Sequence, residues 1–432
     1  MYGTYSFLHL GEEIDEEKFV IVEFYVEADV DILTAAEALA AESSVGTWTG
    51  ISTMHPEILN KLGARVFVVD DDSNIVKIAY PLDLFEPGNM PQVLSDVAGN
   101  VFGMKEIENL RVKNITYPER YVESFMGPAF GISGIRQFFD EPQRPLLGTI
   151  IKPKVGLSSD EHAKVAFEAW VGGVEVVKDD ENLTDQAFNP FEERVVKTIM
   201  MKSKAEDLTG KKKMYVPNIT APSSDMERRA EFVKVQGGEC IMMDVITVGF
   251  GGVQHIRNQN FGLILHGHRA MHGAFTHNTK HGIAMLPIAT ASRLCGIDQL
   301  HTGTIIGKME GGKEDVKEIN KAMRKDWFGI KPTMPIASGG VHPGLIPKMI
   351  ELIGSDVIIN LGGGIHGHPD GTRKGAMAAR QAVDASLSGV SLEEYAKDHE
   401  ELAKAIDKWG TYGNSKLPKS LVTYQYNLSS RK

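Results

Sequence analysis

The first part of the chain alternates strand-like and helix-like hydrophobic patterns. β-branched and aromatic runs predict strands, and an alanine-rich segment behind the N-cap residue Asp31 predicts a helix. Two apolar runs flanking Asp-Asp-Ser-Asn predict a hairpin. In order, we expect a strand at residues 19–28, a helix at 32–42, a hairpin at 64–80, a helix from 90 to the glycines near 100, and a strand at 108–118. This β-α-β-β-α-β order predicts a ferredoxin-like α+β domain over residues 1–125.

From about residue 145 the pattern changes to short apolar strands, each followed by a polar or glycine-bearing loop and a helical stretch. The expected strands lie at residues 146–154, 174–181, 213–220, 240–247, 262–269, 298–304, 334–340 and 356–364. Eight alternating strand and helix units predict a (β/α)8 barrel, with a doubly wound open sheet as the alternative. The barrel is favoured because nearly every strand ends in polar or glycine residues, as expected at the mouth of an active site.

We therefore assign residues 126–432 to a barrel domain that includes a C-terminal helical tail. Residues 391–409 are charged and amphipathic, and they predict one helix that packs on the barrel. The fold class expected for the chain is α/β, a C-terminal (β/α)8 TIM barrel preceded by a ferredoxin-like domain.

Composition narrows the functional classes. The chain has 432 residues, 42% hydrophobic, and a formal net charge of −11 without a block of Lys and Arg, which argues against a nucleic-acid binder. Apolar runs of membrane-spanning length and a signal peptide are both missing from the sequence, so we expect no membrane association. Cys240 and Cys295 lie among apolar residues and are interpreted as free thiols in a reducing, cytoplasmic compartment.

The strongest chemical signal is Lys178-Asp179-Asp180-Glu181 at the end of an apolar strand. Alternation places Lys178 and Asp180 on one face and Asp179 on the other, and Glu181 joins the first pair only if the chain leaves the strand there. Two carboxylates suit Mg²⁺, but a lysine becomes a ligand only as a carbamate formed with CO₂. A solvated salt-bridge cluster is the alternative.

Lysines and histidines at other strand ends are further candidates. Lys152 and Lys154 follow the first barrel strand and could bind an anion, act as a base, or be surface charge. His268 and Arg269 could donate to a phosphate. A zinc site in the histidine-rich stretch 266–281 is disfavoured, because it has neither cysteines nor an H-E-x-x-H pattern.

Glycine-rich segments follow the last strands. Ser338-Gly339-Gly340 and Gly362-Gly363-Gly364 suit backbone binding of phosphate after barrel strands seven and eight, although ordinary tight turns are the alternative. Lys308 lies between glycines after strand six, in a segment that suits a mobile lid or a surface loop.

Taken together, these segments resemble the large subunit of ribulose-1,5-bisphosphate carboxylase/oxygenase (RuBisCO), and most resemble the archaeal-type (form III) enzymes. The resemblance extends over about residues 19–385. It rests on the segments GTIIKPKVGLS, GGVEVVKDDENL, HGHRAMHGAF, HTGTIIGKMEGG, ASGG, LGGGIHGHP, AAESSVGTWTG and GNVFGM.

The resemblance implies a lyase that enolises ribulose 1,5-bisphosphate, adds CO₂ and cleaves the product to two 3-phosphoglycerate, with O₂ as a competing substrate. It implies that a carbamylated Lys178 binds Mg²⁺ with Asp180 and Glu181, and that Lys152 is the base. Lys154 and His268 would assist around the metal and the substrate hydroxyls, and Lys308 would stabilise the new carboxylate.

The resemblance also implies the substrate contacts. Arg269 and His301 would hold one phosphate, and Ser338 would lie near a hydroxyl. The implied contacts of the other phosphate are Gly340, Gly362, Gly363, Thr47 and Trp48. In the family, Glu42, Thr47, Trp48 and Asn100 reach the barrel of a partner subunit, which implies a homodimer with shared active sites, open to higher assembly. A small subunit is not expected.

The departures from the family are small. Ile150 stands where plant forms carry threonine, and Asn360 where many members have glutamine; we expect only tuning of affinity or CO₂/O₂ selectivity. Two alternatives are a RuBisCO-like enolase or isomerase and a non-catalytic phosphosugar-binding protein. The presence of Lys152, Lys308 and the Lys178 cluster disfavours both.

Overall fold

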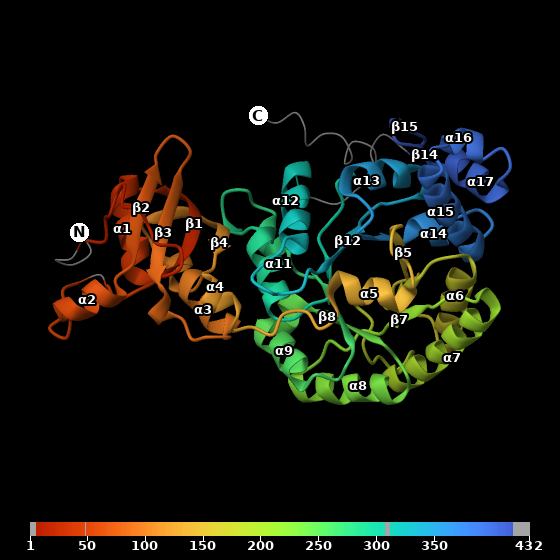
Figure 1. The fold of residues 1–432 in the computed structure, drawn as a ribbon, viewed down its shortest axis with the longest axis horizontal. Coiled ribbons are helices and arrows are strands. Elements are labelled where there is room, and N and C mark those ends of the chain that lie inside the picture. Colours follow the sequence, from red (N-terminus) through yellow and green to blue (C-terminus); the bar gives the residue numbers. More distant parts are fainter. Residues whose placement is uncertain (1–5, 48, 307–311, 418–432) are drawn as a thin grey trace.

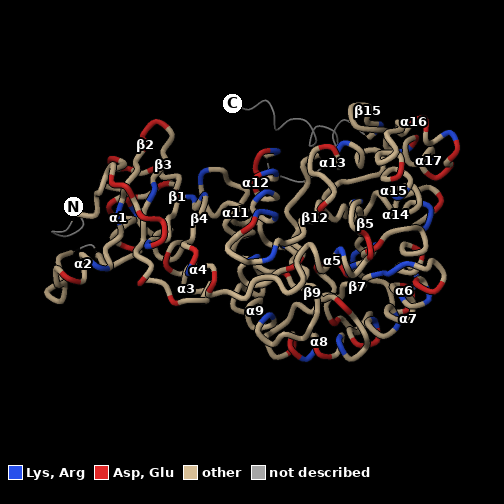
Figure 2. The backbone as a smooth tube through the Cα atoms, in the orientation of Figure 1, with Lys and Arg blue, Asp and Glu red and all other residues tan. Residues whose placement is uncertain are grey.

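The computed structural model describes residues 6–47, 49–306 and 312–417, which form a small mixed sheet followed by a barrel (Figure 1). Acidic and basic residues are interspersed along the backbone of both parts rather than gathered in one segment (Figure 2). Within the described ranges, no helix is long and apolar enough to cross a membrane.

The first sheet has the predicted ferredoxin-like order. β1 (Phe19–Ala28) lies between β3 (Ile75–Pro81) and β4 (Ile107–Thr116), and β2 (Arg65–Asp70) pairs with β3; all these pairs are antiparallel. Alternate residues of β1, from Val20 to Val26, are buried, as a sheet with one covered face requires.

The helices of this part are α1 (Ile32–Glu42), α2 (Pro56–Leu62), α3 (Met90–Val97) and α4 (Glu119–Val122). The Asp31 carboxylate accepts a hydrogen bond from the Thr34 amide at 3.0 Å, which confirms the expected cap of α1. One strand of the sheet was not expected: β10 (Gly282–Ile283) comes from the barrel sequence and pairs in parallel with β4.

All eight barrel strands are present and parallel, and the expected fold class is confirmed. Their order around the barrel is β7-β6-β5-β13-β12-β11-β9-β8. The residues after β7 close the ring against β8, because the Ile219 amide donates to the Met242 carbonyl and the Met242 amide donates to the Pro217 carbonyl. The strands are β5 (Leu146–Ile150), β6 (Val176–Lys178), β7 (Met214–Val216), β8 (Cys240–Asp244), β9 (Ile264–His268), β11 (Gln299–His301), β12 (Met334–Ser338) and β13 (Ile358–Leu361).

Helices surround this barrel (Figure 1). They are α5 (Gly131–Phe139), α6 (Ser159–Val171), α7 (Phe191–Thr209), α8 (Ser223–Val235), α9 (Val245–Gln259), α10 (Gly273–Thr276), α11 (Met285–Leu294), α12 (Lys313–Arg324), α13 (Ile346–Ile353), α14 (Gly363–His366) and α15 (Thr372–Leu387).

The barrel interior is a packed apolar core that leaves only one end for chemistry. Inward residues such as Leu146, Val176 and Met242 pack with Ile135 and Phe139 of α5, which covers the amino end of the barrel. The functional side chains must therefore lie at the carboxyl end of the strands. Cys240 and Cys295 are buried free thiols, as expected.

The C-terminal tail corrects one prediction. Residues 391–409 form two helices, α16 (Leu392–Tyr395) and α17 (Glu400–Trp409), and not one. The His399 ring stacks on Tyr395 at 4.0 Å and its Nδ1 lies 2.7 Å from the Tyr395 carbonyl oxygen, which takes that carbonyl out of a continuing helix. Packing on the barrel is as expected, because α17 lies against α15 with Leu402 and Trp409 buried.

Candidate active site

The carboxyl ends of the parallel barrel strands bring most of the expected site residues to one rim. Lys178 ends β6, His268 ends β9, His301 ends β11 and Ser338 ends β12. The glycines that follow β13 join them there. This convergence follows from the parallel order alone, since all the strands run in the same direction.

Lys178 is a buried lysine surrounded by carboxylates. Only 1% of the residue is exposed, and its Nζ donates to the Asp179 carbonyl at 2.7 Å. Burial lowers the pKa of Lys178, while the charges of Glu181, Asp180 and Asp244 oppose that shift. The lowered pKa makes the neutral amine, the form that reacts with CO₂, easier to reach.

Two lysines from the segment after β5 face the two neighbouring carboxylates. Ile150 pairs with Lys178 in the β5–β6 ladder, so Lys152 comes level with Asp180. The Lys152 Nζ lies 2.8 Å from Asp180 Oδ2, and the more exposed Lys154 Nζ lies 3.4 Å from a Glu181 oxygen. The site thus alternates positive and negative groups.

Asp179 points to the opposite side of β6, as strand alternation predicts. Its Oδ1 accepts from the Tyr215 hydroxyl at 2.7 Å, and its Oδ2 accepts from Arg194 Nε and the Asn218 amide, both at 3.0 Å. His162 Nε2 lies 3.0 Å from Oδ1. Burial alone would raise the pKa of Asp179, but Arg194 and His162 hold it well below its ordinary value. This buried network ties the end of β6 to α6, α7 and β7.

A chain of histidines crosses the rim from β9 to β12. His266 Nε2 lies 3.0 Å from His301 Nε2, and His301 Nδ1 lies 2.8 Å from the Ser338 hydroxyl. His268 contacts Asp244 through Nδ1 at 3.0 Å and faces Glu181 at 3.8 Å. Burial lowers the pKa of His266 to about 3, so that ring stays neutral.

The metal-ligand set at this rim is incomplete without Lys178. In the described part of the chain, no three His, Cys, Asp or Glu side chains come together in a group suited to a metal ion. Asp180 and Glu181 supply two carboxylates beside a buried amine. Burial alone would raise the pKa of Glu181, but His268 and Lys178 lower it to about 2. The donor set fits Mg²⁺ once a carbamate on Lys178 adds a third anionic oxygen.

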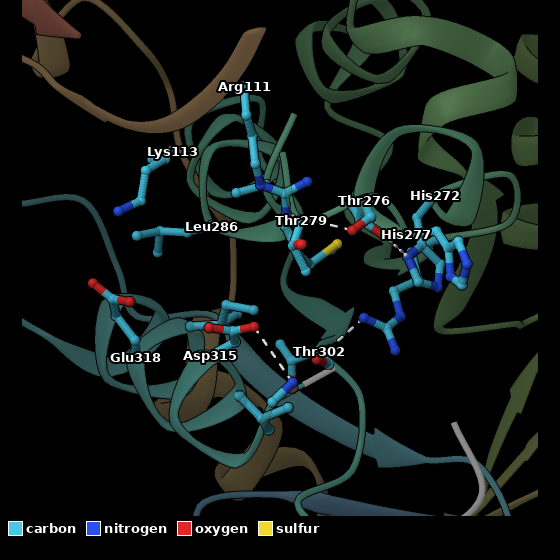
Figure 3. A pocket seen from close by; sticks show the side chains of 16 residues that line it. Arg111, Lys113, His272, Thr276, His277, Thr279, Leu286, Thr302, Asp315 and Glu318 are labelled. Atoms are coloured by element: carbon cyan, nitrogen blue, oxygen red, sulfur yellow. Dashed lines mark hydrogen bonds between the residues drawn. The ribbon is translucent and has the colours of Figure 1, made fainter. Parts of the chain in front are cut away.

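Arg269 borders a cavity of about 400 Å³ beside this rim, lined by both basic and acidic side chains (Figure 3). Its guanidinium donates to the Thr302 carbonyl at 3.3 Å, and burial lowers the pKa of Arg269 to about 10. Arg111 and Lys113 add positive charge to the lining, and Asp315 and Glu318 add negative charge. Arg269 supplies this cavity with a buried guanidinium that suits an anion.

The glycines after β12 and β13 differ in how far their positions require glycine. Gly340 has a φ of +69°, in the left-handed region. A Cβ added at Gly362 would lie 3.4 Å from Lys152 Cε, whereas one at Gly363 would meet open space. The main chain at 362–363 is therefore exposed beside the Lys152 side chain.

The candidates of the first sheet lie away from the barrel rim of the same chain. Glu42 ends α1, on the side of this sheet that faces away from the barrel (Figure 1). Asn100 Nδ2 donates to Glu42 Oε1 at 3.3 Å, and Thr47 is half-buried in the turn after α1. Trp48 and Lys308 lie outside the described residues.

Two residues at this site were not singled out by the sequence analysis. Asp244 contacts His268, and His366 contacts the end of β5. His272, from the histidine-rich stretch 266–281, lines the cavity beside Arg269. Asp244 could have been found from the sequence, because it is a carboxylate at the end of the apolar strand 240–244. Sequence offers no equivalent signal for His366, whose partners in β5 are more than 200 positions away.

Comparison with known proteins gives matches along most of the chain. Residues 11–121 match the family described as "Ribulose bisphosphate carboxylase large chain, N-terminal domain", and residues 131–409 match its catalytic domain. A ribulose bisphosphate carboxylase of Methanocaldococcus jannaschii is 51% identical over 395 residues, covering 87% of this chain and 93% of that protein.

Two solved structures are similar over nearly their whole length. The octameric Rubisco of Pyrococcus horikoshii has a TM-score of 0.89 at 46% identity, covering 93% of this chain and 95% of that one. The dimeric archaeal Rubisco of Hyperthermus butylicus has a TM-score of 0.87 at 41% identity, with 94% and 98% covered.

Proposed function

Because the chain belongs to the ribulose bisphosphate carboxylase large-chain family, we propose how its residues divide the work of that enzyme. It is a ribulose-1,5-bisphosphate carboxylase/oxygenase that resembles the archaeal-type (form III) enzymes. The reaction enolises ribulose 1,5-bisphosphate, adds CO₂ and cleaves the product to two 3-phosphoglycerate, and O₂ competes for the same enediolate.

The family generally uses Mg²⁺ and a carbamylated lysine. In this chain we assign the carbamate to Lys178 and the other metal ligands to Asp180 and Glu181. The buried, pKa-lowered amine and the two adjacent carboxylates support the assignment. When bound, Mg²⁺ supplies an electrophile that stabilises the oxyanion developing on the substrate.

We assign the removal of the C3 proton to Lys152. Its Nζ is held beside Asp180, so the base and the metal ligands face the same substrate carbons. A base acts efficiently only when it is fixed within reach of the proton. Lys154 and His268 flank Glu181 and are assigned to the substrate hydroxyls.

The two phosphates anchor the sugar on opposite sides of the rim. One is assigned to Arg269 and His301, with Ser338 near a hydroxyl; the buried Arg269 guanidinium at the cavity and the contact of His301 with Ser338 support this. The other is assigned to the backbone of Gly340, Gly362 and Gly363, together with Thr47 and Trp48. Remote binding energy then positions the reacting carbons. Lys308 is assigned to the carboxylate formed from CO₂.

The active site is proposed to be shared between two subunits. Asn100 donates to Glu42 at the end of α1, and α1 lies on the side of the first sheet away from the barrel (Figure 1), so we infer that a second chain's barrel receives these residues. The relatives described as dimeric and octameric support a homodimer that is open to higher assembly, and we expect no small subunit. We also propose that the boundary between the two domains lies at residues 125–126 and that the protein is cytoplasmic.

The pairing of Lys152 with Asp180 beside buried Lys178 is the observation that carries this assignment. Purified protein incubated anaerobically with ribulose 1,5-bisphosphate, Mg²⁺ and labelled bicarbonate should form acid-stable label in 3-phosphoglycerate. Consumption of the substrate without labelled product would contradict the carboxylase and indicate an enolase or isomerase.

A further inference from the structure

His366 connects the segment of the proposed base, after β5, with the segment of the proposed phosphate-binding glycines, after β13. Its ring lies at the end of α14, after β13, and Nε2 is 2.9 Å from the Ile150 carbonyl oxygen and 3.0 Å from the Thr149 hydroxyl oxygen. Nδ1 is 3.0 Å from the Thr372 hydroxyl. One imidazole therefore bridges β5, α14 and the start of α15.

The hydrogen-bond partners define a single arrangement of protons. The Ile150 carbonyl can only accept, so Nε2 carries the proton and Nδ1 accepts from the Thr372 hydroxyl. Thr149 donates its own proton to the Leu361 carbonyl at 2.6 Å, which leaves a lone pair facing Nε2. Burial lowers the pKa of His366 to about 4, so the ring is neutral and keeps this arrangement near pH 7.

The bridge begins where the strand ladder stops. β5 and β13 pair from Ile358–Leu146 to Leu361–Thr149, and no further pair follows. The Ile150 carbonyl is the next group along β5, and Lys152 lies two residues beyond it. On the other side, the backbone of Gly362 approaches the Lys152 side chain closely enough that a Cβ there would lie 3.4 Å from Cε.

We propose that His366 is a positioning residue that fixes the Lys152 segment against the phosphate-binding glycines 362–363. The inference rests on the proposed roles of Lys152 and these glycines. Because the same ring holds both segments, binding of the phosphate and placement of the base are mechanically linked. A displacement of about 1 Å in a reacting group can cost about 100-fold in rate.

His368 provides a matched control on the same turn. His368 is buried, its Nε2 lies 2.9 Å from the Glu401 carbonyl oxygen, and its Nδ1 accepts from the Asp370 amide. These contacts lead to α17 on the outside of the barrel and not to β5. Removal of either ring deletes a histidine that contacts a backbone carbonyl, but of these two rings only His366 contacts the Lys152 segment.

The experiment compares His366→Leu with His368→Leu in the full chain, using the solvent exchange of the C3 proton of ribulose 1,5-bisphosphate, kcat, KM and Tm. For His366→Leu we expect exchange and kcat to fall at least about tenfold and KM to rise a few-fold. For His368→Leu we expect a lower Tm with kcat within about twofold of the wild type. Equal effects of the two substitutions on kcat would overturn the proposal.

Conservative variants keep the test decisive if His366→Leu does not fold. His366→Gln places an amide donor near the Nε2 position, whereas the shorter His366→Asn does not reach Ile150. Gln should therefore recover much of the exchange rate and Asn little; equal rates would count against positioning. A wild-type protein that neither exchanges the C3 proton nor fixes CO₂ would instead refute the proposed function itself.

Discussion

The Lys152 Nζ lies 2.8 Å from Oδ2 of Asp180, so the proposed base and a proposed metal ligand are in direct contact. The register of β5 against β6 produces this contact. Ile150 is level with Lys178, and two residues beyond each of these come Lys152 and Asp180. Asp180 itself is fully buried. The carboxylate therefore serves two positive partners, the lysine and the metal.

Removal of Lys152 should separate proton transfer from metal binding. Lys152→Met is expected to abolish the C3 proton exchange, because it removes the proposed base, while Mg²⁺ binding in the presence of bicarbonate stays equal or becomes tighter. Calorimetric titration with Mg²⁺ measures the second effect. Markedly weaker Mg²⁺ binding would show that the lysine builds the metal site and does not compete within it.

Asp179 should be a large contributor to stability. Asp179→Asn leaves Arg194 buried opposite a neutral amide, and breaking one partner of a buried pair costs about 3–5 kcal/mol. The matched control is Asp160→Asn, which breaks the solvent-exposed pair with Lys197 and should cost about 0–1 kcal/mol. Denaturant unfolding of both variants gives the comparison, and similar losses would contradict the network.

A buried carboxyl in the first sheet region should make stability depend on pH. Burial raises the pKa of Asp96 to about 7, and its Oδ2 and the neighbouring Tyr80 hydroxyl lack a hydrogen-bond partner among the described residues. A raised pKa in the folded state means stability that is greatest below the ordinary carboxyl pKa and is lost as pH rises through about 7.

Asp96→Asn should therefore raise Tm at pH 8, with a gain that shrinks as pH falls toward 4. The Ser43 hydroxyl bonds the Asp96 carbonyl, a contact that the substitution keeps. Thermal unfolding at pH 8, 6 and 4 measures the trend. A gain that is constant with pH would mean that the wild-type carboxyl does not titrate in this range.

Mixed dimers test the shared site. Glu42→Gln and Lys178→Ala should each inactivate the enzyme, the first through the partner's site and the second through its own. In a heterodimer one of the two sites carries neither change, so about a quarter to a half of the activity should return. Lack of recovery in isolated heterodimers would place Glu42 and Lys178 in the same chain's site.

The alternation of side chains along a strand predicted much of the site, because it depends only on neighbouring residues in the sequence. It placed Lys178 and Asp180 on one face of β6 and Asp179 on the other, which is what the hydrogen bonds of Asp179 show. It also found every barrel strand, since a buried parallel strand is an apolar run with polar ends.

The features that sequence reasoning missed depend on contacts between distant segments. β10 exists because residues 282–283 meet β4, and His366 gains its role only when β13 and β5 are neighbours. The break between α16 and α17 arises from a side-chain contact of His399 that overrides helical periodicity. The roles of the individual residues were first implied by the family resemblance, and the contact of Lys152 with Asp180 supports them.

The central claim is that the buried amine of Lys178 becomes a carbamate that completes the metal site, and ¹³C NMR of the enzyme with ¹³CO₂ and Mg²⁺ tests it most directly. The account predicts a carbamate signal in the wild type that is missing in Lys178→Ala, together with loss of CO₂-dependent Mg²⁺ binding in that variant. A carbamate signal that persists in Lys178→Ala, or Mg²⁺ binding that is equally tight with and without CO₂, would contradict it.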